Sequence, residues 1–256
     1  MKQDPLFLPH GAPNLAVTQS AAHDFLKEMG PSITAAKALV VISPHWETKG
    51  LKVSAAGPLK TIHDFRGFSE ELHQMNYDGA APQWLVGSVI EAVSSGGLKI
   101  EADDTWGLDH GTWVPLILAL PENTLPIVQV SLPLGYGAAE SIALGRALAP
   151  LAEQGILVIG TGAITHNFRE MGPENQPIPE WAVSFDKDVE NALALGDAAI
   201  LDLKNHAHYQ RALPTDEHLM PLFVAYGAAG KGAAATKLHE SWTHRSLSMS
   251  AYRFAA

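Results

Sequence analysis

The chain has 256 residues, of which 46% are apolar and 17% charged, so it can bury a large core and long disorder is not expected. Its formal net charge is −10 without an evident basic stripe, which argues against a nucleic-acid partner. Cysteine is absent, which excludes disulfides, thiolate metal sites and a cysteine nucleophile. Neither a signal peptide nor a membrane-spanning segment is predicted, so the cytoplasm is the expected location.

Short apolar runs alternate with helical patterns along the chain. In order, the predicted elements are strands at residues 38–43 and 52–54, helices at 69–75 and 82–94, a strand at 98–101, a helix at 113–120, a strand at 125–131, a helix at 138–153, a strand at 156–160, and helices at 180–195 and 215–228. Thr215 or Asp216 is the expected N-cap of the last helix. Three prolines in residues 171–179 predict an exposed loop.

This alternation predicts an α/β fold with a mostly parallel central sheet and helices on both faces. We find no linker, internal repeat or low-complexity segment in the sequence. The simplest organisation is therefore a single domain over residues 1–256.

Three of the twelve histidines follow apolar strand-like segments. His10 follows residues 6–9, His45 follows the strand at 38–43, and His166 follows the strand at 156–160. Ligands of open α/β sheets collect outside the carboxyl ends of the strands. Any one histidine is more often a structural residue, but three in this position indicate a shared site. Neutral imidazole is a common ligand of iron and zinc.

Further histidines occur near predicted helix starts and in loops. His110 precedes an apolar helix, where it is either part of a capping turn or a hydrogen-bonding group for a substrate. His218 is a candidate metal ligand, with Glu217 as the alternative carboxylate ligand. His63 is equally consistent with pocket lining and plain surface. His206 and His208 are expected at the surface.

The sequence lacks the motifs of several common enzyme classes. There is no G-x-S-x-G nucleophile elbow, no G-x-x-x-x-G-K-[ST] phosphate loop and no complete G-x-G-x-x-G fingerprint. Gly160-Thr161-Gly162 is only a fragment of the last, and we interpret its glycines as room for a close backbone approach.

Five segments in order, with a sixth near the C-terminus, resemble the 4,5-DOPA dioxygenase branch of the class III extradiol ring-cleavage dioxygenases. The resemblance covers nearly the whole chain. It rests on Leu8-Pro9-His10-Gly11-Ala12-Pro13, Ser43-Pro44-His45-Trp46-Glu47, Thr61-Ile62-His63-Asp64-Phe65, Leu108-Asp109-His110-Gly111-Thr112-Trp113-Val114-Pro115-Leu116, Gly160-Thr161-Gly162-Ala163-Ile164-Thr165-His166-Asn167 and Glu217-His218-Leu219-Met220-Pro221.

The resemblance implies an α/β fold with a divalent metal held by His10, His45 and His218. A better-known branch of the family uses a glutamate as the third ligand, so Glu217 remains the alternative to His218. The resemblance further implies that His166 is the acid/base residue and that His110 hydrogen-bonds substrate or oxygen. Iron(II) is the metal implied for activity, and zinc(II) is an alternative occupant that does not react with O2.

The expected activity is extradiol cleavage of a catechol-type, DOPA-like aromatic diol with O2. His63 and Trp113 are expected to contact the substrate, with core packing as the alternative for the tryptophan. The alternatives for the whole protein are a zinc enzyme of other chemistry, or a non-catalytic metal-binding protein on the same scaffold. The expected partners are small molecules, without nucleic acid or membrane, and the sequence leaves assembly into a homo-oligomer open.

Overall fold

The computed structural model describes residues 2–122 and 124–255, which build one large mixed sheet. Its strand order is β6-β3-β7-β2-β8-β1-β12-β9. Strands β7, β2, β8 and β1 form a parallel centre, whereas β12 and β9 extend one edge in antiparallel fashion. The strands are β1 (Leu6–Pro9), β2 (Ala38–Thr48), β3 (Leu51–Ser54), β6 (Ile100–Asp103), β7 (Ile127–Pro133), β8 (Ile156–Gly162), β9 (Ala234–His239) and β12 (Ala251–Ala255). The predicted α/β class with a mostly parallel sheet is confirmed.

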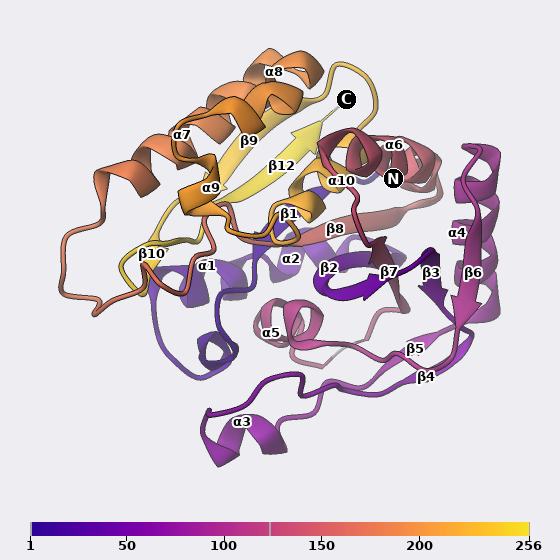
Figure 1. The fold of residues 1–256 in the computed structure, drawn as a ribbon. Helices are drawn as coiled ribbons and strands as arrows, with labels where there is room; N and C mark the ends of the chain where they lie inside the picture. The colour runs from indigo at the N-terminus through magenta and orange to yellow at the C-terminus, as the bar shows by residue number, and fades with distance from the viewer. Residues whose placement is uncertain (1, 123, 256) are drawn as a thin grey trace.

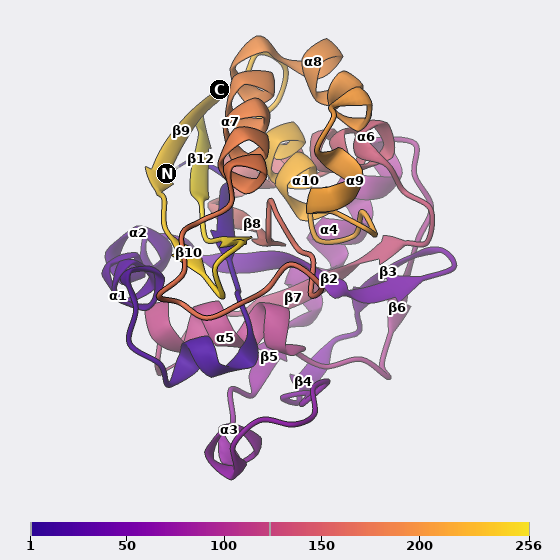
Figure 2. The same ribbon diagram turned by 60° about the vertical axis from the view of Figure 1, so that its left-hand side comes forward.

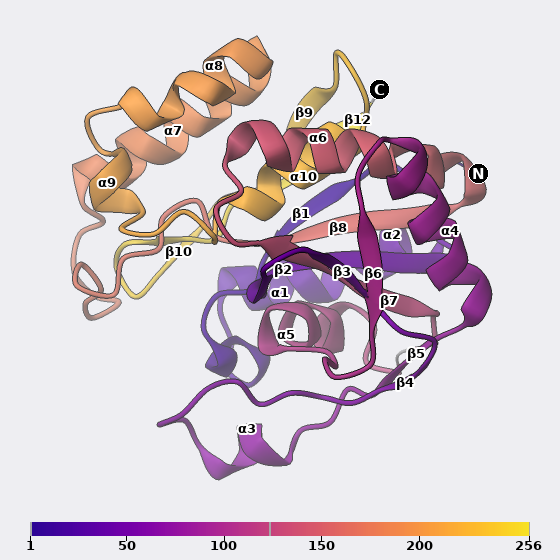
Figure 3. The ribbon, with the colours of Figure 1, turned by 45° about the vertical axis from the view of Figure 1, so that its right-hand side comes forward.

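Helices cover both faces of this sheet. Figures 1 and 3 show α1 (Ala21–Glu28) and α5 (His110–Ala119) on one face, with α6 (Ala138–Leu148) and α10 (Met220–Ala228) on the other. Figure 2 shows α7 (Glu180–Leu195) beside the antiparallel edge. The remaining helices are α2 (Gly30–Thr34), α3 (Glu70–Gln74), α4 (Gln83–Ser95), α8 (Asp197–Asp202) and α9 (Tyr209–Ala212).

Short strands and 3-10 turns complete the described chain. The strands β4 (Gly57–Leu59) and β5 (Gly79–Ala81) pair with each other, as do β10 (Trp242–Thr243) and β11 (Leu247–Ser248). The 3-10 turns are η1 (Pro13–Ala16), η2 (Ala149–Gln154) and η3 (Leu203–Asn205). No helix within the described residues is both long and apolar enough to cross a membrane.

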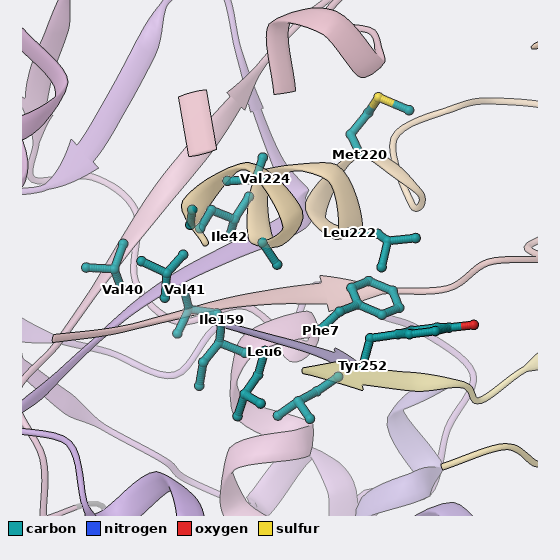
Figure 4. Packing of buried hydrophobic residues seen from close by; sticks show 14 of the residues in the cluster. Leu6, Phe7, Val40, Val41, Ile42, Ile159, Met220, Leu222, Val224 and Tyr252 are labelled. Atoms are coloured by element: carbon teal, nitrogen blue, oxygen red, sulfur yellow. The ribbon is translucent and has the colours of Figure 1, made fainter. Parts of the chain in front are cut away.

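The core lies where the central strands meet the helices. Phe7 and Ile42 of the sheet and Leu222 and Val224 of α10 are all fully buried, and Figure 4 shows them packed together. Burying an apolar side chain of this size contributes about 1.5–3 kcal/mol. Strands covered on both faces need apolar residues at successive positions, which explains the uninterrupted run at residues 38–42.

Most predicted elements are present, with shifted ends. The helix expected at 138–153 ends at Leu148 and continues as the 3-10 turn η2, because Pro150 cannot continue an α-helix. The helix expected at 215–228 begins only at Met220, so Thr215 and Asp216 do not cap it. Pro221 occupies its first turn, which is where a proline favours a helix start. The strands β9 and β12 were not predicted.

Candidate active site

Five histidines from separate parts of the chain converge at the carboxyl edge of the parallel strands. His10 follows β1, His45 lies on β2, His110 is the first residue of α5, His166 follows β8, and His218 precedes α10. We call these five residues the histidine cluster. The ring centroid of His10 lies 5.0 Å from that of His45 and 5.5 Å from that of His218. The structure therefore brings together every histidine that the resemblance assigned to metal binding or catalysis.

An irregularity in β2 lies at His45. The predicted strand ended at residue 43, but β2 runs on to Thr48. Its register against β7 shifts between Ile42 and Glu47, so the residues between them are not paired regularly with that neighbour. Such bulges re-aim side chains next to functional sites. Here the irregular stretch carries His45.

Two glycines of β8 allow the segment before α10 to lie directly on the strand. A Cβ atom at Gly162 would collide with the carbonyl oxygen of His218, and one at Gly160 would collide with that of Pro221. The backbone N–H of Ala163 donates to the His218 carbonyl at 3.0 Å. The predicted close backbone approach at these glycines is confirmed, and it fixes the position of His218.

Ring nitrogens of the cluster face one another, and some of them have no hydrogen-bond partner. The Nε2 atoms of His10 and His45 are 3.3 Å apart. His218 is only 5% exposed, and its Nε2 is buried without a hydrogen-bond partner, while its Nδ1–H donates to Glu217 at 2.9 Å. Buried polar atoms are rarely left unpaired. An open set of imidazole nitrogens of this kind fits a transition-metal ion.

Burial keeps four histidines of the cluster, His10, His45, His166 and His218, neutral near pH 7. Burial and the neighbouring rings lower the pKa of His10 and of His218, and burial with the charge of His110 lowers the pKa of His45 to about 3. Burial lowers the pKa of His166 to about 4, against the opposing charge of Glu217. Neutral imidazole is the form that binds a metal or accepts a proton.

These four neutral histidines make the metal-free protein sensitive to acid. A histidine whose folded-state pKa is lowered binds a proton more readily in the unfolded chain, so its contribution is present above about pH 6.5 and is lost as the pH falls toward the folded value. We therefore expect the unfolding free energy of the metal-free protein to fall between pH 6.5 and 4, by about 1.4 kcal/mol per pH unit for each such histidine. Urea titrations at a series of pH values measure this slope.

The matched variants for this slope are His166→Gln and Phe168→Leu. The Phe168 ring contacts the His166 ring at a centroid distance of 4.7 Å but binds no proton. The first variant removes one titrating group and should give a shallower slope, whereas the second should keep the wild-type slope. Equal slopes for His166→Gln and the wild type would show that His166 does not contribute to the acid sensitivity.

Asp64 is a site residue that the sequence analysis did not select. Its carboxylate lies 2.9 Å from Nδ1 of His110 and 3.6 Å from Nδ1 of His45, and it accepts the backbone N–H of His110 at 3.0 Å. Burial alone would raise the pKa of Asp64, but the hydrogen bonds and charge of His110 outweigh it and lower the pKa. The side chain is therefore an anion that holds two rings of the cluster.

Asp109 connects the sheet to the helix that begins with His110. It is fully buried and caps α5 by accepting the backbone N–H of Thr112 at 3.2 Å. It also accepts hydrogen bonds from Ser43 at 2.6 Å, from Trp106 at 3.2 Å and from Gln129. Burial and the charge of Asp64 raise the pKa of Asp109, and the bonds from Ser43 and Gln129 oppose that rise. Asp109 thus fixes where α5 starts.

Replacement of Asp109 by Asn should destabilise the protein. Four donors point at the carboxylate, and an amide would turn an N–H₂ group toward some of them, so buried donors would lose their acceptor. We expect a loss of about 2–4 kcal/mol of unfolding free energy. Denaturant titration measures it, with the exposed Asp104→Asn as the control. A loss below about 1 kcal/mol would contradict this role.

A cavity of about 230 Å³ opens over the histidine cluster. All five histidines and Asp64 line it, together with a wall of carbon-rich side chains that the sequence analysis did not identify. Phe65 and Phe168 belong to that wall. The loop at 171–179, which is mostly exposed as predicted, adds Met171.

The structure does not bring His63 or Trp113 to the described cavity wall. His63 Nε2 pairs with the Met75 carbonyl at 2.8 Å. Trp113 is fully buried, and its indole N–H donates to the Ile62 carbonyl at 3.1 Å. The ring centroids of His63 and Trp113 lie 5.8 and 6.1 Å, respectively, from the ring centroid of Phe65. His63 and Trp113 therefore pack against Phe65 and do not line the cavity themselves.

Comparisons with known proteins agree with this geometry. Residues 5–255 match the family model described as the catalytic LigB subunit of aromatic ring-opening dioxygenase. The chain is 35% identical over 260 residues to a Beta vulgaris protein named 4,5-DOPA dioxygenase extradiol, covering 99% of this chain and 97% of that one. An Escherichia coli K12 protein of the same name is 31% identical over 229 residues, covering 87% and 84% of the two chains.

A solved structure shares the fold. An uncharacterized protein from Escherichia coli K12 superposes with a TM-score of 0.81 at 27% sequence identity, and the match covers 98% of this chain and 99% of the other. The fold and the site thus define an α/β enzyme with a histidine-built centre at the carboxyl edge of its sheet. The chain belongs to the LigB family and is an extradiol aromatic ring-opening dioxygenase.

Proposed function

We propose that residues 1–256 form one catalytic domain that cleaves a catechol ring with O2, using iron(II) held by His10, His45 and His218. The observation that carries the proposal is the convergence of ring nitrogens: the Nε2 atoms of His10 and His45 face each other at 3.3 Å, and the Nε2 of His218 is buried without a hydrogen-bond partner. Iron(II) would supply Lewis-acid chemistry together with redox chemistry toward O2, and zinc(II) would supply only the Lewis-acid part. Zinc is the alternative occupant of the isolated protein, because the same nitrogens suit it.

His218 is a better third ligand than Glu217. His218 lines the cavity over the histidine cluster, whereas Glu217 lines a different pocket. Glu217 accepts the Nδ1–H of His218, which is the usual arrangement of a carboxylate behind a metal-binding histidine. His110 lies close enough to His10 and His45 to form an alternative group of three. Its Nδ1 contact with Asp64 favours a role in hydrogen bonding instead.

His166 is proposed as the acid/base residue. Its ring lines the cavity and stacks on the ring of His218, with 3.5 Å between the centroids. A neutral imidazole there can accept the proton that a catechol hydroxyl must lose on binding, and can return a proton later. His110, held by Asp64, would donate a hydrogen bond to substrate or oxygen at the opposite side of the cluster.

The substrate proposed here is a catechol-type diol, with O2 as the second reactant. Four relatives carry the name 4,5-DOPA dioxygenase extradiol, which supports a DOPA-like diol. A cavity of about 230 Å³ is small against the 300–1,000 Å³ typical of drug-sized ligands, so a single ring suits it. The ring substituent is a separate question.

Parallel reconstitution with iron(II) and zinc(II) tests the proposed function. We expect the iron-loaded protein to consume O2 and form a yellow ring-opened product from at least one of a panel of catechols, and the zinc-loaded protein to do neither. Hydrolytic turnover by the zinc form would favour a zinc enzyme of other chemistry. Metal binding without turnover by either form would favour a non-catalytic binding protein.

A further inference from the structure

The residue before His166 carries a buried hydroxyl group that makes two hydrogen bonds. Thr165 is fully buried, and its Oγ1–H donates to the Ser246 carbonyl at 2.7 Å. The same oxygen accepts the backbone N–H of Ser248 at 2.8 Å. These two partners flank Leu247, which lines the cavity together with His166. One side chain thus connects the two segments that carry these residues of the cavity wall.

The strand that holds Thr165 is itself attached to a buried carboxylate. Ser248 of β11 donates through its Oγ to Asp186 of α7, which is only 2% exposed. Asp186 also accepts a hydrogen bond from Ser250 at 2.9 Å and lies 3.1 Å from the Lys237 ammonium group. Buried polar networks of this kind rigidify the segments that they join. The strand β11 therefore gives Thr165 a firm point of attachment.

The His166 ring depends on its backbone for its position. Its ring contacts are with His218, at a centroid distance of 3.5 Å and 9° between the planes, and with Phe168 at 4.7 Å. Within the described chain, no hydrogen bond reaches either ring nitrogen of His166. Its backbone N–H donates to the Ala212 carbonyl at 2.8 Å, and Thr165 fixes the residue before it. A catalytic group must be held within about 0.5 Å of its productive position.

We propose that Thr165 is a positioning residue for ring cleavage, whose hydroxyl group, attached to β11, holds the His166 imidazole in place against His218. This inference rests on the proposed function, in which His166 is the acid/base residue, and adds a residue outside the cavity to that site. Thr165 is not part of the described cavity lining, so it acts through His166 and not on the substrate. Loss of its hydroxyl should move the ring without changing what the ring can do chemically.

Thr165→Val removes the hydroxyl and keeps the β-branched shape of the side chain. We expect kcat and kcat/KM for catechol cleavage by the iron-loaded variant to fall together by about 10- to 100-fold, because a misplaced proton acceptor slows the reaction step. KM should stay within about threefold of the wild-type value. Thr165→Ser retains the hydroxyl and should recover most of the rate. A wild-type kcat in Thr165→Val, or an equal loss in Thr165→Ser, would overturn the proposal.

Thr112→Val is the matched control for the loss of a buried hydroxyl. Thr112 is also fully buried, but its Oγ1 has no hydrogen-bond partner among the described residues. The substitution removes the same atoms without breaking a hydrogen bond, so kcat per bound iron should stay within about twofold of the wild type. An equal loss of kcat in Thr112→Val and Thr165→Val would contradict the positioning role.

Ser248→Ala tests the attachment of β11 with a milder change, and it serves also if Thr165→Val does not fold. It removes the side-chain hydrogen bond to Asp186 and leaves the backbone N–H that Thr165 accepts. We expect kcat to fall by about 3- to 10-fold at a nearly constant KM. An unchanged kcat would contradict the part assigned to β11, and a larger loss than in Thr165→Val would contradict the hydroxyl as the link.

A measurement on the metal-free protein separates this proposal from the proposed function. Protons of the His166 and His218 rings should show a nuclear Overhauser effect, because the ring centroids lie 3.5 Å apart. We expect Thr165→Val to lose this effect, and Thr165→Ser and Thr112→Val to keep it. If no catechol is cleaved, the proposed function fails, and loss of the effect in Thr165→Val would still support the positioning role. An unchanged effect in Thr165→Val would overturn that role, whether or not the ring is opened.

Discussion

The replacement of His166 by Gln is expected to lower kcat for ring opening by about 100- to 10,000-fold while the protein keeps its metal. Gln occupies a similar volume beside His218 but cannot accept a proton near neutral pH. In the proposed reaction the neutral imidazole, whose pKa burial lowers to about 4, takes the proton of the bound diol. Steady-state O2 uptake gives kcat, and metal analysis of the same sample gives the iron content.

The control for His166 is Phe168→Ala, which removes the aromatic ring on its cavity side. We expect that variant to change KM more than kcat, because it alters the mouth and leaves the proton acceptor in place. His166→Ala should behave like His166→Gln. A near-wild-type kcat in either His166 variant would refute the acid/base role, and loss of iron would show a structural role instead.

The substitution His218→Ala is expected to weaken metal binding more strongly than any change at Glu217. Removing a ligand should cost more than the 10- to 100-fold loss that accompanies removal of a partner behind a ligand. Glu217→Gln retains an oxygen that can accept the Nδ1–H of His218, so its loss should lie near 10-fold. Competition with a chelator of known affinity measures both variants without reference to activity.

The two variants distinguish the ligand assignments. If Glu217 binds the metal directly, Glu217→Gln should be the more damaging change. If His110 completes the group with His10 and His45, His218→Ala should leave the affinity nearly intact, and His110→Ala should abolish binding. Retention of wild-type affinity by His218→Ala would therefore remove His218 from the proposed metal centre.

The sequence predicted the centre of the fold better than its edge. Residues 38–43 and 156–160 are uninterrupted apolar runs because both faces of those strands are covered. The strands β9 and β12 were missed because both are short and carry alanines, which favour helix as readily as strand, and because β9 is partly exposed. The pairing of β12 with β1 joins residues almost a full chain length apart, and no local pattern encodes that.

Histidine placement was predictable for a similar reason. His10, His45 and His166 follow or lie within strands of a parallel sheet, so their convergence follows from topology. The sequence analysis did not select Asp64, because it assigned the substrate contact to the neighbouring His63. His63 points away, toward the Met75 carbonyl, whereas Asp64 and Phe65 both line the cavity. Residues 62–65 belong to no strand, so no regular alternation of side chains could separate His63 from Asp64 in the sequence.

The apolar wall was beyond sequence reasoning. Phe65, Phe168 and Leu247 come from three separate loops or short strands, and only the packed structure puts them around one cavity. Trp113 was a reasonable candidate because large aromatic rings often line aromatic-ligand pockets, yet it is entirely buried behind Phe65. The position of an aromatic residue along a helix does not reveal which side of a pocket wall it occupies.

A single turnover of a catechol that the iron-loaded protein consumes, carried out under isotopically labelled O2, is the decisive measurement, with the product analysed by mass spectrometry. Extradiol cleavage predicts a ring-opened product that contains both atoms of one O2 molecule. The broken bond joins one hydroxyl-bearing carbon to the adjacent carbon that bears no hydroxyl group. A quinone without labelled oxygen, or a product with a single labelled atom and an intact ring, would contradict ring cleavage at this histidine cluster.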